Sequence, residues 1–90
     1  LLPQDSNYPH ILSLHVESLP VFCVQGKWPS MRDTFLTVVG CRQPSVDSLR
    51  WLKHELPDAL KKQNLILISG AARGIDQAAH EMALICKVPT

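Results

Sequence analysis

Residues 65–76, LILISGAARGID, decide the fold of this 90-residue chain. They run from a continuous apolar segment into a glycine turn and then into the expected start of a helix, which is typical of a buried strand followed by a crossover helix. Backbone N–H groups at a helix N-terminus point outward, and the helix dipole favours negative charge there. The stretch therefore predicts both a parallel α/β sheet and an anion site at the turn.

A second stretch, residues 35–42 (FLTVVGCR), repeats this order of apolar run, glycine and arginine. If the two strands lie parallel in one sheet, both glycine turns open on its carboxyl edge, where ligands bind in open α/β sheets. Arg42 and Arg73 are then brought to one place. A lone arginine would indicate only a solvated or paired surface charge, whereas two beside helix starts favour anion binding.

The segments around these turns predict two strand–helix units over residues 34–90. Ser45 is the expected N-cap of the first helix, and Pro57 inside the helical pattern is expected to kink or restart it. In the second helix, Ala78 and Ala79 allow close packing on the sheet. The second strand is apolar throughout, so both of its faces are expected to be covered. The apolar stripe of the first helix consists of Val46, Leu49, Leu52, Leu56 and Leu60.

Residues 1–33 are predicted to form an irregular N-terminal segment, because four prolines interrupt them. This segment is expected to contain one short strand at residues 21–24 and a short helix over residues 9–14. Residues 34–90 are predicted to be the first two βα units of a Rossmann-like domain, with residues 88–90 approaching a further strand. The fold class is α/β, a Rossmann-like parallel sheet with flanking helices and right-handed crossovers, of which this chain holds the first half.

Composition and charge narrow the function without deciding it. The net charge is +1, so any site for a polyanion must come from local placement of charge. The three cysteines are widely spaced and lack a C-x-x-C pair, which predicts reduced thiols in a cytoplasmic protein. No run approaches the ~20 apolar residues of a membrane span, and the start lacks the pattern of a signal peptide. Because the chain does not begin with Met, we expect it to be a piece of a longer protein.

Several residues near the turns have competing interpretations. Ser69 is not expected to be a nucleophile, because a nucleophile elbow needs a glycine two residues earlier and position 67 is Leu. Cys41 lacks a nearby histidine that would act as its base, which disfavours a reactive thiol. Asp76 is expected to stabilise the first helical turn rather than to act as a catalytic carboxylate. For the turn glycines, the alternative to anion binding is turn geometry alone.

Aromatic, histidine and nucleotide-binding patterns are less specific. Trp51 is expected to be partly buried on the first helix, whereas Trp28 stays open as a base-stacking residue. The histidines show no metal spacing, and His80 is expected to lie at the edge of an apolar helix face. The G-x-x-x-G of residues 70–74 is not the G-x-G-x-x-G of dinucleotide folds, and no G-K-[ST] is present. The sequence therefore predicts neither a cofactor nor a metal.

Three stretches together resemble a known family. Residues 8–26 include YP and LPVFCVQG, residues 38–45 (VVGCRQPS) are similar to V-G-S-R-x-P-S, and residues 69–80 (SGAARGIDQAAH) are similar to S-G-x-A-x-G-I-D-x-x-A-H. In this order and spacing, the chain resembles the DNA processing protein A family (DprA, also called Smf). The resemblance covers nearly the whole chain. Cys41 departs from it, because the family usually has Ser or Thr there.

The resemblance implies a Rossmann-like domain that binds single-stranded DNA and passes it to the RecA recombinase during natural transformation. It also implies a homodimer. Together with the two turns, it predicts a DNA-binding module that performs no chemistry and holds phosphates through sequence-independent, salt-dependent contacts. The expected phosphate-binding residues are Gly40, Cys41, Arg42, Ser69, Gly70, Ala71, Ala72, Arg73 and Gly74.

Two alternatives stay open from the sequence. One is a Rossmann-like phosphoribohydrolase that cleaves nucleoside monophosphates, although the P-G-G-x-G-T loop of such enzymes is absent from these residues. The other is a segment that only scaffolds a dimer. A sheet of so few strands exposes an unpaired edge, so we also expect association with a second copy or with the rest of the protein.

Overall fold

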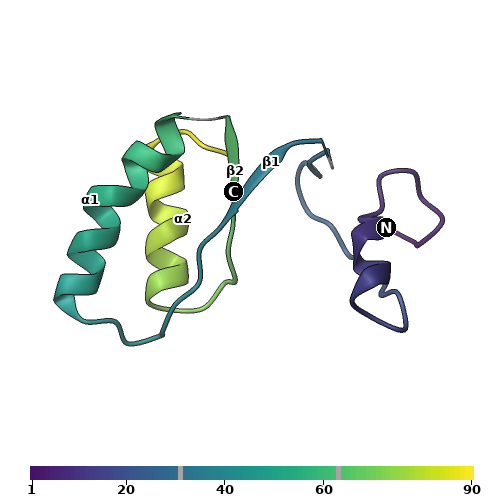
Figure 1. Ribbon diagram of the computed structural model, residues 1–90, viewed down its shortest axis with the longest axis horizontal. Helices are drawn as coiled ribbons and strands as arrows, with labels where there is room; N and C mark the ends of the chain where they lie inside the picture. Colours follow the sequence, from purple (N-terminus) through teal and green to yellow (C-terminus); the bar gives the residue numbers. More distant parts are fainter. Residues whose placement is uncertain (31, 63) are drawn as a thin grey trace. The chain divides into compact units, whose positions relative to one another are not determined.

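The computed structural model describes residues 1–30, 32–62 and 64–90. It divides into two compact units, Leu1–Arg32 and Asp33–Thr90, which are described separately. The described elements follow the order η1 (His10–Leu14), β1 (Thr34–Thr37), α1 (Val46–Lys62), β2 (Leu65–Ile68) and α2 (Ile75–Ile85) (Figure 1). The boundary expected between residues 33 and 34 lies one residue from this division.

The first unit is built around the buried ring of Tyr8. Its hydroxyl donates a hydrogen bond to the carbonyl of Pro20, and its ring packs against Phe22 with centroids 5.5 Å apart. Phe22 in turn contacts Trp28, whose indole N–H donates to the carbonyl of Asn7 at 3.0 Å. The ring of Trp28 is therefore fixed by contacts with Asn7 and Phe22 within the first unit.

The strand expected at residues 21–24 is wrong for the described structure, which has no regular element there. Phe22 exchanges backbone hydrogen bonds only with Leu1, the ammonium of Leu1 donating at 2.6 Å and the N–H of Phe22 donating at 3.0 Å. One bonded pair does not make a ladder, so β propensity alone does not produce a strand. The expected short helix forms as the 3₁₀ helix η1, directly after Pro9.

In the second unit, β1 and β2 pair in parallel with Thr34 opposite Leu65 and Thr37 opposite Ile68. The N–H of Val38 donates to the carbonyl of Ile68 at 3.0 Å, just beyond the ladder. β2 forms as predicted, whereas β1 begins one residue earlier than expected and ends at Thr37. Parallel strands joined by a crossover helix confirm an incomplete, Rossmann-like α/β arrangement.

The chain returns to the sheet after α2. The N–H of Leu67 donates to the carbonyl of Pro89 at 2.9 Å, while the carbonyl of Ile68 faces β1. Because neighbouring residues of a strand direct their backbone groups to opposite edges, Pro89 lies on the edge of β2 away from β1. Figure 1 shows the end of the chain beside β2. This position matches the expected approach to a further strand.

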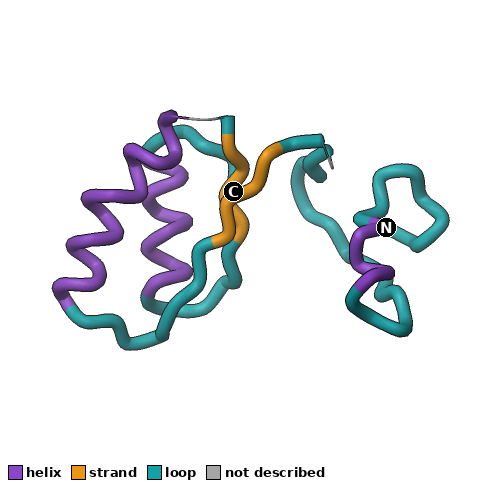
Figure 2. The backbone as a smooth tube through the Cα atoms, in the orientation of Figure 1, coloured by secondary structure: helices purple, strands orange, loops and turns teal. Residues whose placement is uncertain are grey.

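The helices α1 and α2 pack against each other and cover one face of the strand pair (Figure 2). Their contact is close because α2 presents alanines. Covering of both faces of β2 was expected, but the side chain of Ile68 points away from the helices and is 46% exposed. The buried core consists of Leu52, Leu56, Leu60, Leu67, Ala78, Ala79 and Ala83.

Helix α1 runs as one element through Pro57, so of the expected kink or restart the restart is wrong and the kink stays a prediction. Val46 belongs to the predicted apolar stripe, yet it is exposed, because the first turn of α1 extends beyond the packing surface. Leu49 is partly buried against the core, so the apolar stripe packs on the core from Leu49 onward.

The start of α1 confirms Ser45 as its N-cap. The N–H of Ser48 donates to the hydroxyl oxygen of Ser45 at 3.0 Å, and the Ser45 hydroxyl donates to that of Ser48 at 2.9 Å. We expect Ser45→Ala to lower the free energy of unfolding by about 1 kcal/mol, because a helix N–H loses its acceptor. Urea unfolding measures this change. Ser48→Ala is the matched control, since it leaves the capping oxygen in place, and an equal loss in both variants would contradict the capping role.

Candidate nucleic-acid interface

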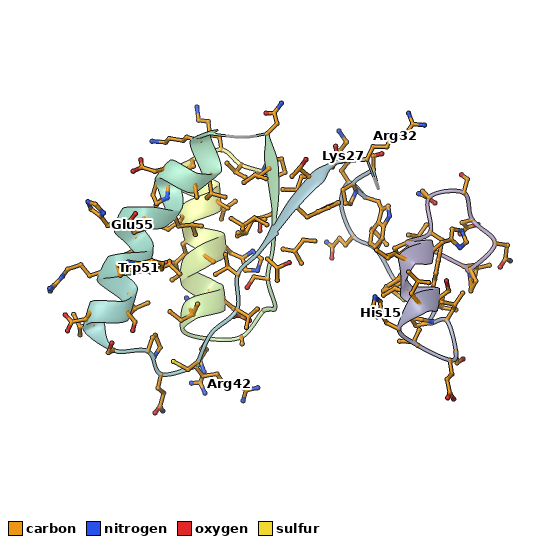
Figure 3. The ribbon with its side chains drawn as sticks, viewed as in Figure 1. His15, Lys27, Arg32, Arg42, Trp51 and Glu55 are labelled. Atoms are coloured by element: carbon orange, nitrogen blue, oxygen red, sulfur yellow. The ribbon has the colours of Figure 1, made fainter. Side chains whose placement is uncertain are left out.

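The turns that follow β1 and β2 lie against each other. The N–H of Ile75, at the start of α2, donates to the carbonyl of Cys41 at 3.2 Å and so joins them. Arg42, Gln43 and Arg73 line one open depression of about 500 Å³. Figure 3 shows Arg42 on the loop that leads from β1 to α1. The structure thus brings together the two arginines that the sequence placed at one edge of the sheet.

Close approach explains the glycines of these turns. A Cβ atom on Gly40 would lie 2.6 Å from side-chain atoms of Ile75, and one on Gly70 would lie 2.7 Å from Oδ2 of Asp76. Gly74 adopts a φ of +87° and is the N-cap residue of α2. A Cβ atom there would lie 2.7 Å from the carbonyl oxygen of Arg42. The two turns can therefore pack together only because Gly40 and Gly74 lack side chains, and Gly70 leaves room for the Asp76 carboxylate within the second turn.

The backbone donors of the two turns have no acceptor in the part of the chain that the structure describes. Among the residues that the structure describes, the N–H groups of residues 40–43 and 69–73 make no hydrogen bond to the chain. Gly70, Ala71 and Arg73 are exposed. The expectation that Arg42 lies beside a helix start needs correction, because α1 begins only at Val46, after the Ser45 cap. The helix-terminus argument applies to the second turn alone.

The hydroxyl of Ser69 forms a hydrogen bond within the protein. It donates to the carbonyl of Val38 at 2.6 Å and thereby ties the end of β2 to the end of β1. Of the donors of Ser69, only the backbone N–H stays available to a ligand. The thiol of Cys41 is exposed and free, and it offers a phosphate only a weak donor.

The exposed charged side chains of the depression at this edge of the sheet are two arginines. Arg42 and Arg73 are both exposed, and neither forms an ion pair within the described part of the chain. Bidentate guanidinium groups suit phosphate oxygens. In residues 1–30, 32–62 and 64–90, no three His, Cys, Asp or Glu side chains are grouped to hold a metal ion.

Two side chains behind the second turn were not recognised as parts of the site. Asp76 is 7% exposed, and its Oδ1 has no hydrogen-bond partner among the described residues. His80 contacts the carbonyl of Gly70 through Nε2 at 3.1 Å. Its place in the motif of residues 69–80 was visible in the sequence, but the contact joins residues ten positions apart and depends on the path of the turn.

The partial burial expected for Trp51 is wrong, because this residue is 67% exposed. The first turns of α1 flank a second, mostly apolar depression of about 560 Å³ beside the end of β1. The residues lining it are Val38, Val39, Asp47, Ser48, Trp51, Leu52 and Ile75. No described helix is both long and apolar enough to cross a membrane.

The fold and the paired turns define a Rossmann-like α/β arrangement with two arginines at one edge of the sheet. Comparison with known proteins identifies the family. The family model described as DNA recombination-mediator protein A matches residues 1–90. The chain is also 31% identical over 88 residues to Protein Smf of Synechocystis sp. (strain ATCC 27184 / PCC 6803 / Kazusa). The chain therefore belongs to the DNA recombination-mediator protein A family, also known as DprA or Smf.

The match to Protein Smf covers 93% of this chain but 22% of that relative. The chain thus spans about a fifth of the length of the curated relative that it matches. No solved structure gave a significant match.

Proposed function

We propose that this segment binds the phosphate backbone of single-stranded DNA and that its protein serves DNA processing in natural transformation. The observation that carries the proposal is the common depression lined by Arg42 and Arg73, beside N–H groups that have no internal acceptor among the described residues. Family membership supports DNA as the polyanion, since the family is described as a recombination mediator. The proposed role is binding without catalysis, in the cytoplasm.

Each part of the turns has a proposed role in this binding. The guanidinium groups of Arg42 and Arg73 hold phosphate oxygens bidentately, and the N–H groups of residues 70–72 donate to the same or a neighbouring phosphate. Gly40 and Gly74 let the turns approach each other. None of these groups reads a base edge, so affinity is expected to depend on salt and not on base sequence.

A competition titration tests this function against the nucleotide-cleaving alternative. A fluorescent oligothymidylate is titrated with the intact protein, and unlabelled oligonucleotide or nucleoside monophosphate is added as competitor. We expect the unlabelled oligonucleotide to displace the probe, and nucleoside monophosphate at the same phosphate concentration not to displace it. The result should be the same in EDTA, because no metal ligands are proposed. Tighter binding of the monophosphate, with release of free base, would instead support the phosphoribohydrolase.

The proposed partners are a RecA-type recombinase and a second copy of the protein. An unpaired strand edge supports association with a second copy or with the rest of the protein, because its free N–H and C=O groups can pair with another strand. In the described part of the sheet, β1 pairs only with β2, so its outer edge is open. Sedimentation of the intact protein tests the homodimer, and a strictly monomeric species at high concentration would contradict it.

A further inference from the structure

His80 joins the second turn to the end of the chain. It lies in α2, and its Nε2 is 3.1 Å from the carbonyl oxygen of Gly70, at the beginning of the turn. Its Nδ1 is 2.6 Å from the hydroxyl oxygen of Thr90, next to the residue whose carbonyl pairs with β2. The imidazole ring therefore bridges two segments that leave opposite ends of α2.

The two partners assign the proton positions of the neutral ring. A backbone carbonyl only accepts hydrogen bonds, so Nε2 of His80 carries the hydrogen and donates it to Gly70. In the neutral imidazole, Nδ1 is then an acceptor, and the hydroxyl of Thr90 donates to it. The bond from Thr90 thus favours the tautomer whose Nε2–H can donate to the carbonyl of Gly70.

This hydrogen bond orients a whole peptide unit. The carbonyl of Gly70 and the N–H of Ala71 belong to one planar trans peptide, so they point in opposite directions. With the oxygen fixed toward His80, the N–H of Ala71 points away from α2. It is one of the N–H groups without an acceptor in the described chain. We propose that His80 is a positioning residue of the anion site, which presents the Ala71 N–H to a DNA phosphate.

The hydrogen bond from His80 is needed because residue 70 is a glycine. Glycine has the widest range of backbone angles, so by itself it does not fix the orientation of the peptide that follows it. A competing acceptor also lies close by. Oδ2 of Asp76 approaches Gly70, and Oδ1 of Asp76 is buried without a partner in the described chain. A buried acceptor gains by capturing a donor, so a released peptide would turn an N–H inward to Asp76. The bond from His80 keeps the donor outward.

This inference rests on the proposed DNA binding, and a matched pair of amide variants tests it in the intact protein. Nε2 of glutamine sits at the same distance along the side chain as Nε2 of histidine, whereas the asparagine amide is one methylene shorter and cannot reach Gly70. We expect His80→Asn to weaken binding of labelled oligothymidylate about tenfold, the share of one charge-assisted hydrogen bond. We expect His80→Gln to stay within about twofold of the unmodified protein.

A structural readout separates this inference from the proposed function. The amide ¹⁵N resonance of Ala71 reports the hydrogen bond to its preceding carbonyl, and it should shift in His80→Asn but not in His80→Gln, with or without DNA. Both variants lose the bond from Thr90, so both unfolding midpoints should fall, and affinities are compared under conditions where both variants stay folded. An equal loss of affinity in the two variants, or no loss in His80→Asn, would overturn the positioning role. Failure of the unmodified protein to bind oligothymidylate would overturn the DNA-presenting role together with the proposed function, and an unmoved Ala71 resonance would overturn the orienting bond itself.

Discussion

The double variant Arg42→Ala/Arg73→Ala is expected to bind single-stranded DNA roughly 10- to 100-fold more weakly than the unmodified protein at moderate salt, since each arginine supplies a charge-assisted phosphate contact. The loss should be equal for all base sequences, because phosphate contacts carry no sequence information. The slope of log affinity against log salt should fall by about 0.7 for each phosphate that the variant no longer neutralises. Anisotropy titrations with two unrelated oligonucleotides at several salt concentrations measure both effects.

Two controls separate position from charge. Arg50→Ala also removes one positive charge, but Arg50 lies on α1, pairs with Asp47 at 3.6 Å and does not line the depression. It is expected to leave affinity within about twofold, because an exposed charge away from the bound DNA is screened by salt. Arg42→Lys keeps the charge and loses the bidentate fork of the guanidinium. Its DNA affinity should therefore lie between those of Arg50→Ala and Arg42→Ala. Equal losses in Arg50→Ala and Arg42→Ala would refute the assigned site.

The sequence predicted the part of the fold that depends on local patterns. The apolar run of β2 forms a strand because its residues suit a buried parallel pair, and the hydroxyl of Ser45 caps α1 because serine at that position meets a free helix N–H. The convergence of Arg42 and Arg73 also followed from topology alone, since parallel strands end at one edge. Their contact with phosphate stays a prediction.

The errors arose where neighbours, rather than local pattern, decide the structure. The run at residues 21–24 has strand-forming residues, but the described structure offers it only one bonded pair, through Leu1. Trp51 was expected to be partly buried because it is next to Leu52, yet it is 67% exposed at the apolar depression beside the start of α1. The bond from His80 to Gly70 depends on where the turn passes, which spacing alone does not specify.

The sequence predicted where the turn glycines lie, whereas the structure explains why those positions need glycine. A glycine after each strand predicted a turn, but it did not reveal which neighbour forbids a side chain. At Gly40 that neighbour is Ile75, and at Gly74 it is the pair of carbonyl oxygens of Cys41 and Arg42. Each turn thus excludes a side chain from the other, and the backbone packing of the turns keeps the two like-charged arginines beside one depression.

Gly74→Ala is expected to lower the free energy of unfolding by about 3 kcal/mol or more, because it combines two penalties. Its φ of +87° is costly for any residue with a Cβ atom, and the new methyl group would overlap the carbonyl of Arg42. Relief of that overlap requires the two turns to separate, so DNA affinity should also fall. Urea unfolding and oligothymidylate titration measure the two effects.

Gly26→Ala is the matched control for the steric part of this prediction. Gly26 also has a positive φ, +97°, but a Cβ atom there would meet nothing within 4 Å. Its expected cost is therefore the backbone penalty alone, about 1–2 kcal/mol, with no change in DNA affinity. The difference between the two variants isolates the packing of one turn on the other. If Gly74→Ala cost no more than Gly26→Ala and bound DNA equally well, close packing of the turns would not be what holds Arg42 beside Arg73.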